Sequence, residues 1–233
     1  MSPSGAPVAV ALDAADLETA VGWAAALAPV VSTMKVGLEL YLRSGAPGVT
    51  RIRDVAGDCA LFLDLKLHDI PNTVAGAARA VAPLAPDLLT VHAIGGAAMV
   101  RAAVDALPNT RIVGVTVLTS MDDAALAEVG LAGPPADAVL RLAGLAVHAG
   151  ARALVCSPRE VAGVRAEVGP DITLITPGVR IEGTDLGDQA RVATPQQALA
   201  DGADLLVIGR PITSAVDPLV AAQSIAWSIE RAL

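Results

Sequence analysis

Short apolar segments alternate with helical segments eight times along this chain of 233 residues. The apolar segments are rich in Val, Leu, Ile and Ala, a composition typical of parallel strands that are covered on both faces. We predict strands at residues 8–12, 31–36, 60–67, 88–92, 111–118, 153–156, 172–175 and 205–208, each followed by helix. Eight such units predict a single-domain (β/α)8 barrel, the TIM barrel, over residues 1–233.

A doubly wound open sheet is the competing architecture. It would be favoured by a G-x-G-x-x-G motif after the first strand, and the sequence has none there. The chain also shows no internal repeat, low-complexity tract or linker that would divide it. The barrel is therefore the preferred prediction.

The third predicted strand has one apolar face and one polar face. Leucines occupy positions 61, 63, 65 and 67, and the alternate positions hold Phe62, Asp64, Lys66 and His68. Pro71 is expected to end the strand, and Asn72 or Thr73 to cap the following helix. In a barrel, polar side chains at the carboxyl end of a strand are usually functional, so this stretch is the first candidate site.

Other predicted strands also end in polar residues, which a barrel brings to one rim. These rim residues are Asp13, Lys35, Asp64, Lys66, Asp69, His92, Thr119, Arg180, Gln189 and Arg210. They form two groups: an alternating acid–base set from strands one to three, and arginines beside glycines after strands seven and eight.

The acid–base group predicts proton transfer next to a substrate carboxylate. Lys35, Asp64, Lys66 and Asp69 could form a closed chain of opposite charges, with neighbours about 4 Å apart attracting by about 4 kcal/mol at an effective dielectric constant of 20. Such a chain keeps Lys66 protonated and places carboxylate charge where a substrate anion enters. That arrangement suits loss of a substrate carboxylate and protonation of the resulting carbanion.

The second group predicts a phosphate site. Gly178 and Gly209 allow backbone N–H groups to approach a ligand closely, and Arg180 and Arg210 add bidentate donors. Pro211 suits the first turn of a helix whose dipole favours an anion. The alternative is that these arginines pair with surface carboxylates, namely Glu182, Asp185 or Asp204.

Composition excludes several classes of protein. A net charge of −8 argues against a nucleic-acid surface, and no apolar run reaches the roughly 18 residues that span a bilayer. The amino terminus lacks an export signal, so we expect a cytoplasmic protein. Cys59 and Cys156 are too few for a disulfide framework and are expected to be buried thiols. His92 and His148 are expected to be structural, and no metal site is predicted.

At these residues the chain resembles the orotidine 5′-phosphate decarboxylase family. The matching motifs are ALD at 11–13, KVG at 35–37, DLKLHDIPNT at 64–73, TVHA at 90–93, TVLTS at 116–120, TPGVR at 176–180, DQ at 188–189 and VIGRPI at 207–212. They run in order through nearly the whole chain. The resemblance implies decarboxylation of orotidine 5′-phosphate to uridine 5′-phosphate and CO2, the last step of de novo UMP biosynthesis.

Carried over by position, the resemblance also implies a role for each site residue. Lys66 would protonate C6 of the pyrimidine, Asp64 would lie against the departing carboxylate, and Lys35 and Asp69 would complete the charged network. The implied substrate contacts are Asp13, Lys35 and Thr73 to the ribose, Thr119 to the pyrimidine, Arg180, Gly209 and Arg210 to the phosphate, and Gln189 to phosphate and base. The family is a homodimer in which Asp69 and Thr73 enter the neighbouring subunit's site, and it uses no metal or organic cofactor.

Two other functions stay open at this point. D-x-K-x-x-D alone is shared with metal-dependent barrel enzymes that act on sugar phosphates, such as hexulose-phosphate synthases and pentulose-phosphate epimerases. A catalytically silent phosphate-binding barrel is the third possibility, and the intact set of Asp64, Lys66 and Asp69 argues against it.

Overall fold

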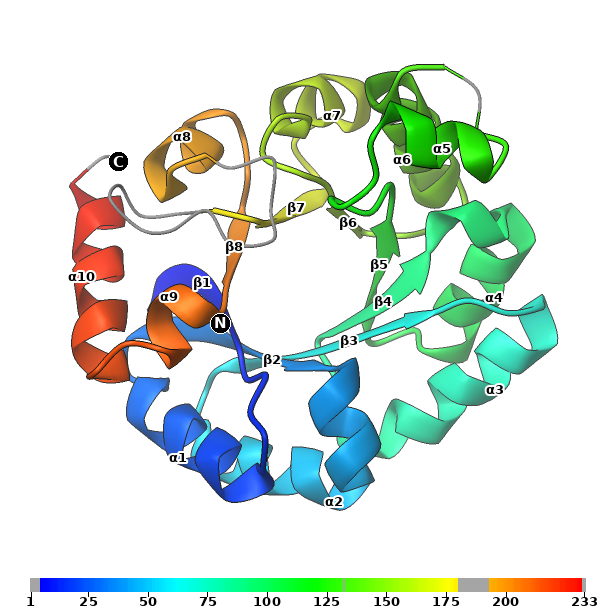
Figure 1. The fold of residues 1–233 in the computed structure, drawn as a ribbon. Coiled ribbons are helices and arrows are strands. Elements are labelled where there is room, and N and C mark those ends of the chain that lie inside the picture. Colours follow the sequence, from blue (N-terminus) through cyan, green and yellow to red (C-terminus); the bar gives the residue numbers. More distant parts are fainter. Residues whose placement is uncertain (1–4, 132, 180–192, 232–233) are drawn as a thin grey trace.

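The computed structural model describes residues 5–131, 133–179 and 193–231. Its eight parallel strands close into a barrel in chain order, and β1 pairs with β8 to complete the ring. Helices surround the strands (Figure 1). The predicted (β/α)8 barrel is therefore confirmed, and the rim at the carboxyl ends of the strands is the place to look for a site.

The strands are short and the helices vary in length. The strands are β1 Ala6–Ala11, β2 Val31–Gly37, β3 Ala60–Leu67, β4 Leu88–His92, β5 Arg111–Val115, β6 Ala153–Val155, β7 Thr173–Pro177 and β8 Leu205–Ile208. The α-helices are α1 Leu17–Leu27, α2 Leu38–Val55, α3 Pro71–Val81, α4 Ala97–Ala106, α5 Asp123–Glu128, α6 Pro135–His148, α7 Val161–Val168, α8 Pro195–Ala200, α9 Arg210–Thr213 and α10 Pro218–Glu230.

Three local predictions are corrected by the structure. β5 ends at Val115 instead of residue 118, because its neighbour β6 ends at Val155 and offers no partner strand beyond it. The helix after β2, which the sequence predicts only for residues 38–43, continues to Val55 across a kink at Gly45, whose φ is 58°. Ile70 is the residue that precedes α3 and Pro71 occupies its first turn, so neither Asn72 nor Thr73 caps that helix.

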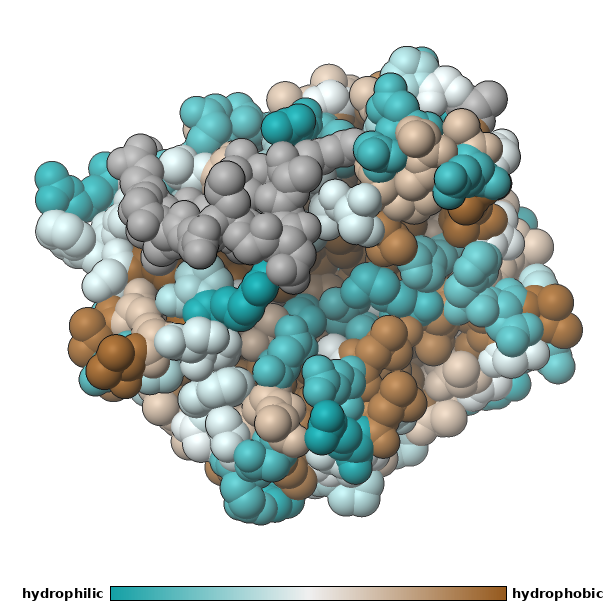
Figure 2. All heavy atoms as spheres, viewed as in Figure 1, coloured by the Kyte–Doolittle hydropathy of each residue, from teal (hydrophilic) through white to brown (hydrophobic). Residues whose placement is uncertain are grey.

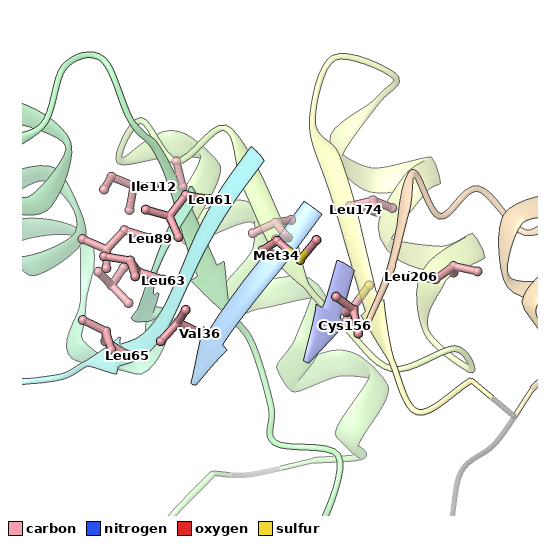
Figure 3. Close-up of a cluster of buried hydrophobic side chains, with 14 of the residues drawn as sticks. Met34, Val36, Leu61, Leu63, Leu65, Leu89, Ile112, Cys156, Leu174 and Leu206 are labelled. Atoms are coloured by element: carbon pink, nitrogen blue, oxygen red, sulfur yellow. The ribbon is translucent and has the colours of Figure 1, made fainter. Parts of the chain in front are cut away.

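The two faces of each strand pack into different cores. Inside the barrel, Phe62 is the largest member of a small cluster and lies among residues as small as Ala9 and Ala153. Outside it, the leucine face of β3 packs under the helices. Figure 3 shows Leu61, Leu63 and Leu65 beside Leu89 and Ile112 in that outer cluster.

This division decides where the polar face of β3 points. Since alternate residues of a strand face opposite sides, Phe62, Asp64 and Lys66 share the side opposite the outer leucines. All three line one cavity at the carboxyl end of the barrel. The predicted alternation is thus confirmed as far as Lys66.

Candidate active site

A compact cluster of charges lies where β1, β2 and β3 end. Asp64 bridges two ammonium groups: its Oδ1 lies 2.7 Å from Lys66 Nζ and its Oδ2 lies 3.3 Å from Lys35 Nζ. Lys35 Nζ also lies 3.7 Å from Asp13 Oδ1. The side chains of Lys35 and Asp64 are only 8% and 14% exposed, against 29% for Lys66. Lys66 is therefore the ammonium group of this cluster that a ligand can reach most easily.

The local backbone explains how these groups come so close. Strands β2 and β3 pair with Gly37 opposite Asp64, next to the Lys35 ammonium. A Cβ atom on Gly37 would lie 2.8 Å from Asp13 Oδ1 and 3.1 Å from Lys35 Nζ. Any larger residue would displace the ion pair between Asp13 and Lys35. The sequence motif contained this glycine, but its purpose becomes evident only from these distances.

The charges set the protonation state of Asp64. Burial is the largest single influence on its pKa and raises it, but the nearby charges of Lys35 and Lys66, with hydrogen bonds from Lys66 and Thr90, together hold the pKa below its usual value. Asp64 is therefore ionised at neutral pH. A buried carboxylate between two ammonium groups creates a strong local electric field, and a substrate in the adjoining cavity would experience it.

The cluster opens into a cavity of about 220 Å³. Asp64, Lys66 and Thr119 supply its polar groups, and the remaining lining residues are Phe62, Val115, Val117, Leu118, Val155, Pro177 and Val207. Thr119 thus lines the same cavity as two of the charged residues, Asp64 and Lys66. A larger cavity of about 330 Å³ lies at the opposite, amino-terminal end of the barrel and includes Thr33 and Arg111. It contains none of the charged cluster, so the smaller cavity is the candidate active site.

Asp69 does not join the charged cluster within one chain. It is exposed, and its Oδ1 accepts a hydrogen bond of 2.6 Å from the backbone N–H of Ile70. Thr73 is also exposed. The predicted closed chain of Lys35, Asp64, Lys66 and Asp69 is therefore not formed by a single copy, because β3 ends at Leu67 and the following turn carries Asp69 to the surface.

Part of the predicted phosphate site is described by the structure. Gly178 has a φ of 82°, a conformation that favours glycine, and Gly209 immediately precedes α9, which begins with Arg210. Arg180 and Gln189 lie outside the described residues. Of the three carboxylates named as alternative partners for the arginines, Asp204 pairs with Arg165 at 2.5 Å, and Glu182 and Asp185 lie outside the described residues.

The histidines and cysteines lie outside the cavity lining. His92 is half-buried, and burial, followed by the charges of His68 and Lys66, lowers its pKa, so it is neutral at pH 7. Cys156 is buried, which raises its pKa to about 12. Cys59 is only partly buried, contrary to the prediction, and its thiol lies 3.2 Å from the carbonyl of Val31.

Two classes of feature are absent from the part of the chain that the structure describes. It holds no group of three or more His, Cys, Asp or Glu side chains placed to bind a metal ion. Its helices are also too short or too polar to cross a membrane.

Comparison with known proteins assigns the fold and the site to a family. The sequence profile of the orotidine 5′-phosphate decarboxylase / HUMPS family matches residues 6–225. The chain belongs to this family. Among its relatives, orotidine 5′-phosphate decarboxylase from Thermobifida fusca is 70% identical over 226 residues, covering 97% of both chains. The enzyme of the same name from Frankia casuarinae is 58% identical over 243 residues, covering 97% of this chain and 89% of the relative.

A solved structure supports the same assignment within the family. The crystal structure of orotidine 5′-phosphate decarboxylase from Lactobacillus acidophilus superposes with a TM-score of 0.83 at 36% identity. The superposition covers 96% of this chain and 99% of that one. The likeness thus extends over the whole barrel.

Proposed function

We propose that this chain is an orotidine 5′-phosphate decarboxylase that forms uridine 5′-phosphate and CO2. The observation that carries the proposal is the Asp64 carboxylate held ionised between Lys35 and Lys66, with Lys66 facing an apolar cavity. The 70% identity to a relative of that name supports the same reaction. A metal-dependent reaction on a sugar phosphate is not favoured, because the relatives from Thermobifida fusca, Frankia casuarinae and Lactobacillus acidophilus all carry the decarboxylase name.

The cluster supports a simple chemical sequence. The bond between C6 and the carboxylate of the substrate breaks, CO2 leaves, and the electron pair stays on C6. The Lys66 ammonium then gives its proton to C6 and is left neutral until solvent protonates it again. Asp64 faces the departing carboxylate and keeps Lys66 charged until the transfer, while Lys35 holds Asp64 in place. Interactions that strengthen as negative charge grows on C6 accelerate the reaction most.

The remaining residues are proposed to bind the nucleotide. Asp13 and Lys35, whose charged groups lie 3.7 Å apart, would hold ribose hydroxyls, and Thr119, which lines the same cavity as Asp64 and Lys66, would meet the pyrimidine. Gly209 and Arg210 would bind the phosphate at the start of α9. Arg180 and Gln189 keep their implied contacts to phosphate and base as part of this proposal. We assign all of this chemistry to one domain, residues 1–233, without a cofactor.

We further propose that two copies share their sites. Asp69 and Thr73 are exposed in one chain although the family places them against substrate, and Ile70 beside them is 67% exposed. A second copy that covered this turn would bury Ile70 and receive Asp69 into its own cluster, next to Lys66. The assembly would be a closed two-fold dimer.

The reaction is tested by following the loss of orotidylate absorbance with the purified protein, with and without a chelator. Equal rates in both are expected. A chelator-sensitive reaction on a sugar phosphate, with no turnover of orotidylate, would overturn the proposal.

The shared site is tested by mixing two inactive variants, Lys66→Ala and Asp69→Ala, dissociating them together and letting them reassociate. A mixed dimer then holds one doubly changed site and one intact site. Random pairing makes half of the dimers mixed, so about a quarter of wild-type activity should return. If mass measurement confirms mixed dimers and no activity returns, both residues serve the same chain's site.

A further inference from the structure

Thr90 is a fully buried polar residue in the middle of β4, at 0% exposure, and it contacts both principal residues of the site. It does not line the cavity, so it is not placed to touch substrate. We propose that the Thr90 hydroxyl is a positioning residue that holds Asp64 and the backbone of Lys66 in their reactive geometry, an inference that rests on the proposed function.

The hydroxyl makes two hydrogen bonds with opposite roles. It donates to Asp64 Oδ1 at 3.1 Å and accepts from the backbone N–H of Lys66 at 2.8 Å. Asp64 Oδ1 is also the oxygen that accepts from Lys66 Nζ at 2.7 Å. Thr90 therefore helps determine which carboxylate oxygen faces Lys66, and leaves Oδ2 for Lys35. Both hydrogen-bonding functions of the hydroxyl are in use.

The bond to Lys66 N–H stabilises an unusual backbone conformation. Lys66 has a φ of 48°, in the left-handed region that residues with a side chain rarely adopt. The pairing of β3 with β4 shifts register between Leu63 and Leu67, which is where Lys66 lies. A regular ladder would give the Lys66 N–H a backbone partner, whereas here its partner is the Thr90 side chain. The irregularity aims the Lys66 ammonium at Asp64 and at the cavity, as bulges next to active sites often do.

Only a hydroxyl at this position supplies both bonds within the same volume. Valine has nearly the same shape as threonine but can neither donate to Asp64 nor accept from Lys66. Without these bonds, the Lys66 backbone can relax toward a regular strand, and Asp64 Oδ1 loses one of its two donors. A small displacement of the proton donor then lowers the rate of proton transfer more than it lowers binding of the nucleotide.

The test compares Thr90→Val with Thr90→Ser, using a matched control. Thr33→Val makes the same chemical change in β2, where Thr33 is buried at the amino-terminal end of the barrel, away from the charged cluster. Turnover of orotidylate, its KM, and the dissociation constant of the product UMP are measured for each protein, together with the thermal unfolding temperature.

We expect kcat of Thr90→Val to fall by about 10- to 100-fold, with the UMP dissociation constant changed by less than about threefold. Thr90→Ser should recover most of the loss, and Thr33→Val should stay near wild type even if its unfolding temperature falls. Should Thr90→Val fail to fold, Thr90→Ala removes the hydroxyl without adding a methyl group and is read in the same way.

Two results would overturn the inference. One is a kcat for Thr90→Val (or Thr90→Ala) within about twofold of wild type; the other is a serine variant as impaired as the valine variant. Both results differ from failure of the proposed function. If the proposed function were wrong, the wild-type protein itself would not turn over orotidylate.

Discussion

The two sides of the cavity differ in chemical character. On the side built from β1 to β4, Asp64 and Lys66 line the cavity, and Lys35, Asp13 and Thr90 stand behind them through contacts that lead to Asp64. The side built from β5 to β8 is mostly apolar and presents Val115, Val117, Leu118, Val155, Pro177 and Val207. One side therefore carries the charged groups, and the apolar side chains of the other side leave little room for water next to those groups.

The difference matters because the strength of a charge interaction depends on what surrounds it. Coulomb energies grow as the effective dielectric constant falls, so an apolar wall opposite Asp64 and Lys66 strengthens their effect on a bound substrate. Figure 2 shows hydrophilic and apolar surface lying side by side on this face of the molecule. We infer that the charged side performs the chemistry. The other side would lower the effective dielectric constant around the substrate and supply the phosphate contacts.

The largest expected effect comes from removing Lys66, the proposed proton donor on the charged side. Lys66→Ala should lower kcat by many orders of magnitude and weaken binding much less, since Lys66 acts mainly as charge develops on C6. Single-turnover rates and UMP binding measure the two effects separately. Retention of more than about a tenth of wild-type turnover, equivalent to about 1.4 kcal/mol of barrier, would show that Lys66 is not the donor.

A smaller effect is expected from removing Arg210, the proposed phosphate contact. Arg210→Ala should weaken substrate affinity and also lower kcat, by about 10- to 100-fold in kcat/KM, because binding energy from the phosphate can help to exclude water from the site. Arg231→Ala is the matched control, since Arg231 lies over the Trp227 ring at the end of α10. An unchanged kcat at saturating substrate would mean that the phosphate serves binding alone.

The apolar wall itself can be changed without changing its shape. Val155→Thr adds a hydroxyl opposite the charged residues and should lower kcat/KM by about 3- to 10-fold, because the hydroxyl admits water and weakens the local field. Val155→Ala, which stays apolar, should lose less. If Val155→Ala lowered kcat/KM more than Val155→Thr, the low polarity of this wall would not be what matters for the reaction.

The smallest effect is a dependence of stability on pH. Because the pKa of Asp64 is lowered in the folded protein, its carboxylate contributes stability above the unfolded value of about 3.9, and this contribution is lost as the pH falls through the folded pKa. The difference in unfolding free energy between wild type and Asp64→Asn should therefore shrink as the pH is lowered below about 4. Denaturant titrations of both proteins at several pH values measure it, and a difference that grew in acid would contradict the lowered pKa.

The sequence by itself determined the architecture and most of the charged side. The period-2 alternation of β3 placed Asp64 and Lys66 on the face opposite the leucines, and eight repeats of strand and helix sufficed to predict a closed barrel. These features are local in sequence, so side-chain periodicity and strand ends reveal them directly. The matching motifs then pointed to the family that the comparisons confirmed.

Tertiary structure decided what depends on contacts between distant strands. The purpose of Gly37 depends on the position of Asp13, 24 residues earlier, and Thr90 reaches Asp64 across 26 residues of chain. The left-handed backbone of Lys66 lies where the pairing of β3 with β4 shifts register, and no sequence pattern indicated this irregularity. The structure separates Asp69 from the charged cluster of its own chain, because the turn after Leu67 carries Asp69 to the surface. Local preferences set which face a residue takes, whereas the pairing register between strands sets which groups on that face meet.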